Sequence, residues 1–281
     1  MRVAVANSSL LARSHGEVGE ALCDSAKEYS IPLLHSLPEA LQLLTLPEAE
    51  DGDKPETHAQ RLLTSIWEAV CEHSQGCHFV DTHASPLVSG DMPAGFVSNI
   101  PPSDDTRLSW LNCITVIEAK QLLSGSQLHT AIGQIASRFV RVQEQQDERC
   151  VLVFFLVDER GVIVGQLSPS ELERWPFELR LSALIPFVGH QGMMLQCWGH
   201  SLVAIKYCAH SSGGNDIVGT ALRVIWQFFA PDIQGGESVA TRFGFVPSGD
   251  LIAPTLNYVA NVMHDAEMVP TWRLLSVALL A

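Results

Sequence analysis

The stretch Cys113-Ile-Thr-Val-Ile-Glu118-Ala-Lys120 decides the fold that this sequence predicts. Its first five residues are apolar or β-branched, a composition typical of a buried strand. Side chains two residues apart on a strand project from the same face, so Glu118 and Lys120 are predicted to point into one site. A carboxylate there can hold a divalent cation, and an ammonium beside it can orient a water or stabilise charge on a phosphate.

The segments around this strand show helical and extended patterns in a definite order. Before it, residues 56–73 carry apolar side chains at three- and four-residue spacing, and two short strands are predicted at 78–81 and 95–98. After it, a helix is predicted over 127–145 and a strand over 150–157. This order predicts an α/β fold with a mixed central sheet flanked by helices.

Three parts are expected along the chain. Residues 1–50 are expected to form an N-terminal helical segment, and a charged loop containing Gly and Pro follows it. The core is expected to span 56–165, with a hairpin partner strand beginning at Val162. Residues 166–281 are expected to form a C-terminal α/β extension packed on this core, with a short helix opened by Ser168.

The motif Val116-Ile-Glu118-Ala-Lys120 and the helix from His129 to Phe139 resemble the PD-(D/E)xK nuclease superfamily. The resemblance is to its fungal and oomycete branches, which include domains beside fungal kinases and in Crinkler-type effectors, and it covers about residues 56–165. It implies a restriction-endonuclease-like core that cuts phosphodiester bonds of DNA or RNA with Mg²⁺ or Mn²⁺.

The resemblance also implies roles for particular side chains. Glu118 would bind the metal and Lys120 would assist the attacking water. Gln134, on the helix after the strand, would support the site, and Glu68 on the first helix would add a metal ligand.

One position departs from the family pattern. The family's aspartate normally follows a proline at the start of the second strand, and here Pro93 is followed by Ala94. Either Asp91 supplies the second metal-binding carboxylate in a shifted register, or this ligand is absent. In the second case the chain is a catalytically inactive nuclease-fold module that binds protein or nucleic acid, as part of an effector or a mobile-element protein.

Each of these residues also has an ordinary structural interpretation. Glu118 and Lys120 could form an ion pair at the polar end of a buried strand, which contributes little to stability at a surface. Gln134 could be a residue of a helix face without a role, and Glu68 a solvated side chain.

Composition limits the classes of function. The formal net charge of −14, from 17 basic and 31 acidic residues, argues against a protein that coats nucleic acid through a broad basic surface. It leaves room for an enzyme whose site is locally basic or charged by a metal. The resemblance implies nucleic acid as the partner, and the apolar residues near the C-terminus indicate a protein partner or a homodimer as well.

Cysteine spacing and hydropathy indicate the compartment. The seven cysteines are scattered and form no CxxC pair, which is typical of reduced thiols rather than a disulfide framework. No apolar run reaches the about 18 residues of a membrane span, and the N-terminal residues lack the apolar run of a signal peptide. We therefore expect an intracellular protein of the cytoplasm or nucleus with no membrane partner.

Overall fold

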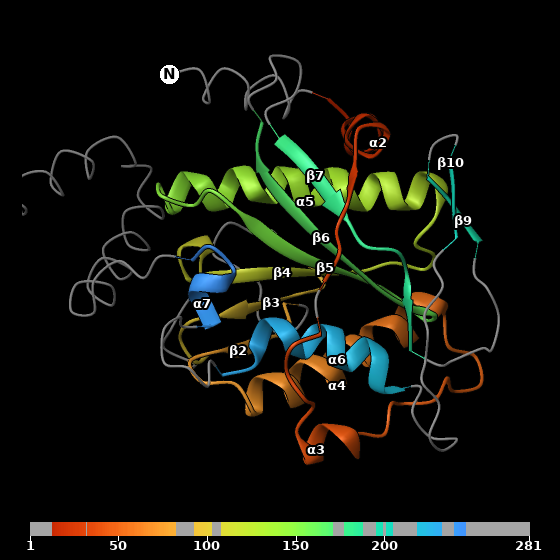
Figure 1. Ribbon diagram of the computed structural model, residues 1–281, viewed down its shortest axis with the longest axis vertical. Coiled ribbons are helices and arrows are strands. Elements are labelled where there is room, and N and C mark those ends of the chain that lie inside the picture. Colours follow the sequence, from red (N-terminus) through yellow and green to blue (C-terminus); the bar gives the residue numbers. More distant parts are fainter. Residues whose placement is uncertain are drawn as a thin grey trace, which may run out of the picture.

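The computed structural model describes most of the first 187 residues and shorter pieces beyond them. The described residues are 13–31, 33–82, 93–102, 108–170, 177–187, 195–198, 201–204, 218–231 and 239–245. They form a mixed sheet with helices on both faces, so the α/β class predicted from the sequence is confirmed (Figure 1).

The helices and strands alternate through the first half of the chain. The helices are α2 (His15–Asp24), α3 (Glu39–Gln42), α4 (Pro55–Glu72), α5 (Gly125–Gln145), α6 (Val218–Phe229) and α7 (Val239–Arg242), with a 3-10 turn η1 (Trp110–Asn112). The strands are β1 (Lys27–Glu28), β2 (His78–Val80), β3 (Gly95–Ser98), β4 (Cys113–Ala119), β5 (Leu152–Asp158), β6 (Gly161–Pro169), β7 (Phe177–Leu181), β8 (Ile185–Pro186), β9 (Leu195–Trp198) and β10 (Ser201–Ala204).

The main sheet has eight strands in the order β1-β7-β6-β5-β4-β3-β2, with β8 paired to β6. Strands β2, β3 and β4 form an antiparallel meander. Strand β5 then lies parallel to β4, because the α5 crossover returns the chain to the same end of the sheet. On the far side β6 and β7 continue antiparallel, and β1 pairs in parallel with β7. Strands β9 and β10 form a separate hairpin.

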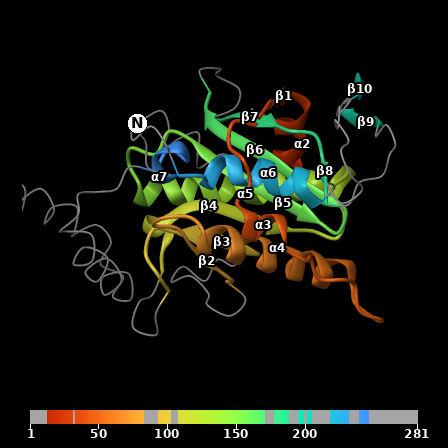
Figure 2. The ribbon, with the colours of Figure 1, turned by 60° about the horizontal axis from the view of Figure 1, so that its bottom comes forward.

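One face of the sheet is covered by α4 and α6, and the other by α5 and α2 (Figure 2). Pro55 begins α4, where its missing N–H costs no hydrogen bond, and a stripe of buried residues on α4 faces the sheet. Trp67 of α4 packs edge-on against Phe155 of β5, with ring centroids 5.2 Å apart. On the opposite face α5 buries a matching stripe that includes Ile135 and Phe139.

The α2 helix packs on the outer side of α5 through two glycines. A Cβ atom placed on Gly19 would lie 1.7 Å from the carbonyl oxygen of His129, and one placed on Gly133 would lie 1.8 Å from that of His15. Only a hydrogen at each position allows the two helix backbones to approach so closely. These glycines therefore set how tightly α2 covers α5.

Two segments outside the central strands differ from what the sequence predicts. The short helix expected at Ser168 is wrong in its described part, because Ser168 and Pro169 complete β6 and pair with Glu178 and Phe177 of β7. The N-terminal segment is helical at α2 and α3, but β1 between them joins the sheet. The main sheet therefore takes strands from all three of the expected parts of the chain.

No helix within the described ranges is both long and apolar enough to cross a membrane.

Candidate functional site

Glu118 and Lys120 lie where two parallel strands end side by side. Glu118 pairs with Leu156 across the β4–β5 ladder, and the backbone N–H of Lys120 donates to the carbonyl oxygen of Val157 at 2.9 Å. The carboxyl ends of neighbouring parallel strands, with a helix N-terminus above them, are the usual position of ligand sites in α/β sheets. The first turn of α5 begins at this same edge (Figure 1).

The two side chains share one face, as the period of a strand predicts. Lys120 Nζ donates to Glu118 Oε1 at 2.7 Å. Arg138 of α5 donates from Nη1 to the other carboxylate oxygen, Oε2. The side chains of Glu118, Arg138 and Lys120 are only 6%, 12% and 18% exposed, so this is a partly desolvated cluster of one carboxylate and two cations.

The charge state of Glu118 follows from its two neighbours. Burial opposes ionisation of the carboxyl group, but the guanidinium of Arg138 and the ammonium of Lys120 favour the carboxylate more strongly. Together they lower the pKa of Glu118 below its ordinary value of 4.5. The carboxylate is therefore ionised at neutral pH, and each of its oxygens is held by a cation.

Arg138 is the member of this cluster that the sequence did not identify. It follows Gln134 by four residues, and Thr130 precedes Gln134 by four, so the three form one stripe along α5. Polar residues at this spacing on a helix that covers a buried strand could have signalled a site facing the strand. Which strand residue they would meet depends on how α5 crosses β4, and the sequence does not contain that crossing angle.

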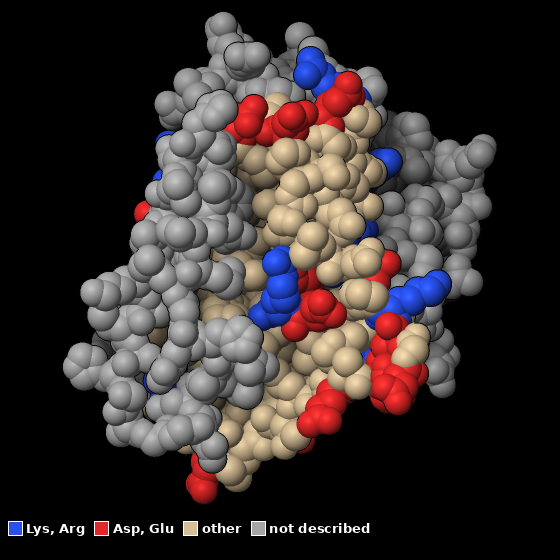
Figure 3. All heavy atoms as spheres, turned by 90° about the vertical axis from the view of Figure 1, so that its right-hand side faces the viewer, with Lys and Arg blue, Asp and Glu red and all other residues tan. Residues whose placement is uncertain are grey.

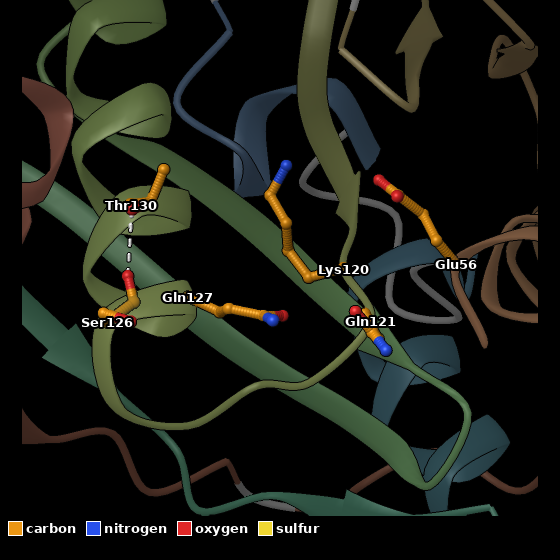
Figure 4. Close-up of a pocket in the computed structure, with 6 residues that line it drawn as sticks. All are labelled: Glu56, Lys120, Gln121, Ser126, Gln127 and Thr130. Carbon is orange, nitrogen blue, oxygen red and sulfur yellow. Dashed lines mark hydrogen bonds between the residues drawn. The ribbon is translucent and has the colours of Figure 1, made fainter. Parts of the chain in front are cut away.

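A hollow of about 260 Å³ opens beside this cluster, between the beginnings of α4 and α5. Polar side chains line it: Glu56, Lys120, Gln121, Ser126, Gln127 and Thr130. Figure 4 shows the ammonium of Lys120 and the carboxylate of Glu56 directed toward the same part of the hollow, while the amide groups of Gln121 and Gln127 approach each other below. The hollow therefore offers both charges and neutral hydrogen-bonding groups to a polar ligand.

The loop that carries these groups is fixed at two points. The backbone N–H of Leu122 donates to Gln127 Oε1 at 3.0 Å, and that of Leu123 donates to Asp158 Oδ2 at 2.9 Å. Asp158 is fully buried at the end of β5 and accepts a further backbone hydrogen bond from Arg160 at 2.9 Å. The wall of the hollow is thus held in place before any ligand binds.

No protein-family model matches this chain, and neither a curated protein nor a solved structure matches it.

The residue that faces Glu118 from the neighbouring strand is an alanine, at the position where the resemblance would imply an aspartate. Strand β3 pairs with β4 from Gly95, which lies opposite Ile117, so the next step of this register sets Ala94 opposite Glu118. Ala94 is buried and belongs to the apolar cluster beside α4. Its carbonyl oxygen accepts a hydrogen bond from Gln60 Nε2 at 2.9 Å. Asp91, the expected substitute ligand, lies outside the described residues.

The other two predicted residues differ in how close they come to the site. Gln134 lies on α5 one turn before Arg138, and its Oε1 atom is buried without a hydrogen-bond partner. Glu68 is exposed on α4, twelve residues beyond Glu56, which places it about 18 Å further along the helix axis than the hollow. Glu56, rather than Glu68, is the glutamate that α4 brings to this edge.

The donors around Glu118 do not fit a divalent cation. Mg²⁺ prefers six oxygen ligands in near-octahedral geometry, and carboxylates supply the charge that holds it. Among the described residues there is no group of three or more His, Cys, Asp or Glu side chains placed to share a metal ion. Both oxygens of Glu118 are engaged by cations instead. No catalytic step through Mg²⁺ or Mn²⁺ follows from these residues.

Proposed function

We propose that this chain is a nuclease-fold module of the PD-(D/E)xK type that binds its partner without cutting phosphodiester bonds. The observation that carries the proposal is the state of Glu118, whose two carboxylate oxygens accept hydrogen bonds from Lys120 and Arg138. The methyl group of Ala94 across from Glu118 supports it further. Nucleic acid is the partner that the resemblance implies.

The arrangement of elements supports the nuclease-fold part of the proposal. Helix α4 is followed by the antiparallel meander β2-β3-β4, and α5 then connects β4 to the parallel strand β5. This is the order expected of a restriction-endonuclease-like core, with Glu118 and Lys120 on its third strand. Their side-by-side placement beside α5 agrees with the E-x-K motif of that family.

A second candidate is the metal-dependent endonuclease, which is favoured by the intact Glu118–Lys120 pair and by the position of Gln134 on α5, one turn before Arg138. In this case a carboxylate from outside the described residues, with Asp91 the first choice, would have to complete the site. The two candidates differ in one observable property, which is hydrolysis.

The distribution of surface charge favours binding of nucleic acid at one small site over binding across a broad basic surface. The side on which α5 begins carries Lys and Arg interspersed with Asp and Glu among the described residues, with no continuous basic area (Figure 3). The formal net charge of −14 adds to this, because phosphate neutralisation by basic residues supplies most non-specific affinity for nucleic acid. We therefore expect weak binding that depends on Lys120 and the polar groups of the hollow.

The deciding experiment is incubation of plasmid, single-stranded DNA and RNA with this chain in Mg²⁺ or Mn²⁺, alongside the variants Glu118→Ala and Ala94→Asp. The binding module predicts no cleavage by the unmodified chain. Cleavage that Glu118→Ala abolishes would establish the endonuclease instead. Cleavage by Ala94→Asp alone would identify a disabled nuclease and support the proposal directly.

The affinity of the chain for nucleic acid is measured by fluorescence anisotropy of labelled DNA and RNA in EDTA. Lys120→Gln should weaken binding, while Lys27→Gln, on the exposed end of β1, serves as the matched control. An equal loss in both variants would mean that binding follows total charge rather than this site. No binding of either nucleic acid would direct the search to a protein partner.

A further inference from the structure

We infer that Arg138 takes the place at Glu118 that a divalent cation would need, so that Arg138 is the residue that excludes metal from this site. The inference rests on the proposed nuclease-like fold for the expectation of a metal at this position. It concerns a residue for which the resemblance implies no role.

The first step is the chemistry of the pair. A guanidinium carries a positive charge, and its planar N–H groups suit a carboxylate oxygen. Arg138 therefore supplies permanently the positive charge that a metal ion would supply only when bound. The pair is 6% and 12% exposed at its two side chains, so the attraction is only weakly screened by solvent.

The second step is competition for the same atom. A cation that binds Glu118 through Oε2 must displace Arg138, and the released guanidinium would then lie close to a second positive charge. Lys120 already occupies Oε1, so the carboxylate has no oxygen free of an ion pair. Two cations a few ångströms apart in a poorly solvated site repel strongly, and this repulsion lowers the affinity for metal.

The third step is the way α5 fixes the guanidinium. Arg138 directly precedes Phe139, which belongs with Ile135 and Ala136 to the buried stripe that packs α5 on the sheet, so the backbone at Arg138 cannot shift without disturbing that packing. One helical turn away, the buried oxygen of Gln134 has no hydrogen-bond partner. The cation is thus carried by a packed segment of α5, with its own side chain only 12% exposed.

The test compares Mn²⁺ binding by the full chain and by Arg138→Met, followed through the free Mn²⁺ signal in electron paramagnetic resonance. The unmodified chain should bind Mn²⁺ at this site more weakly than about 1 mM, and Arg138→Met should gain at least about tenfold in affinity. The gain should disappear in the double variant Glu118→Gln/Arg138→Met. Arg141→Met is the matched control, because Arg141 lies on the same helix with its side chain 48% exposed.

A second measurement, the urea midpoint of Glu118→Gln, needs no metal and tests the inference even if Arg138→Met does not fold. Carboxylates gathered to hold a metal repel one another in its absence, so neutralising one of them stabilises the protein or leaves it unchanged. Glu118→Gln here removes the anion that pairs with both Lys120 and Arg138 among the described residues, and it should lower the urea midpoint.

Two results would overturn the inference. One is Mn²⁺ binding by the unmodified chain at micromolar concentration that Glu118→Gln abolishes; the other is a urea midpoint of Glu118→Gln equal to or above that of the unmodified chain. Neither depends on nucleic acid, so loss of the proposed binding function, measured by anisotropy, is distinguishable from failure of this assignment.

Discussion

The backbone N–H of Leu123 donates to the carboxylate of Asp158 at 2.9 Å, and this bond joins the loop after β4 to the end of β5. The same carboxylate accepts from the backbone N–H groups of Arg160 and Gly161 and from the Arg160 guanidinium. One buried side chain therefore holds both the wall of the hollow and the β5–β6 turn. Asp158 itself is not one of the residues that line the hollow.

Asp158→Ala is expected to destabilise the fold by about 3 kcal/mol or more, because it leaves buried N–H groups without acceptors. Urea denaturation measures the loss. Asp147→Ala, at an exposed position after α5, is the control and should change stability by less than about 0.5 kcal/mol. Equal stability of the two variants would contradict the role given to Asp158.

The contact between α2 and α5 predicts opposite effects for two alanine substitutions in the same helix. Gly19→Ala would drive a methyl group into the carbonyl of His129 and should cost about 3 kcal/mol or separate the helices. Gly16→Ala meets only Thr130 Oγ1, at 4.0 Å, and should be neutral or stabilising by up to about 1 kcal/mol. Thermal unfolding of the two variants measures the difference, and a harmless Gly19→Ala would show that α2 is not packed this closely.

Part of this fold could be predicted because its signals are local. The apolar, β-branched run before Glu118 predicted β4, and the three- and four-residue spacing of apolar side chains predicted α4 and α5. Strand β7 has an equally local signal that was missed: in Phe177-Glu-Leu-Arg-Leu181 the buried and more exposed side chains alternate. Strand β1, with two residues, is too short for any pattern to reveal it.

The candidate site, like the fold, could be predicted only where its signals are local in the sequence. That Glu118 and Lys120 share a face follows from the two-residue period of a strand, and the structure confirms it. The pairing of Glu118 with Arg138 spans twenty residues and depends on how α5 crosses the sheet. That Glu56 lies beside the hollow and Glu68 further along α4 could not be predicted either, because the sequence indicates a helix but not which end of it meets the carboxyl edge of β4.

Thiol reactivity should report the burial of β4. Cys113, at the start of that strand, is fully buried, and burial raises the pKa of its thiol to about 12. Cys150 is exposed just before β5. Because the thiolate is the reactive form, iodoacetamide at mild alkaline pH should modify Cys150 well before Cys113, as peptide mass spectrometry can follow. Modification of both at the same rate would contradict a packed β4.

The cluster at Glu118 predicts how stability changes with pH. Since the pKa of Glu118 is lowered in the folded state below the ordinary 4.5, its ionisation stabilises the fold above that pH, and this contribution is lost as the pH falls toward the folded pKa. Glu118→Gln should therefore be about 3 kcal/mol less stable than the unmodified chain at neutral pH. The difference should shrink progressively below pH 4.5, as the carboxyl group is protonated first in the unfolded chain and then, below its lowered pKa, in the folded one.

Urea denaturation of both proteins from pH 7 to pH 3 measures this difference. Glu144→Gln is the control, because that carboxylate is half exposed on α5 and pairs with the exposed Arg141. A Glu118→Gln deficit that stayed constant across the whole range would mean that the loss comes from packing rather than from charge. A deficit that closes in acid would mean that the carboxylate is held between Lys120 and Arg138 in solution, which is the arrangement on which the proposed metal-free site depends.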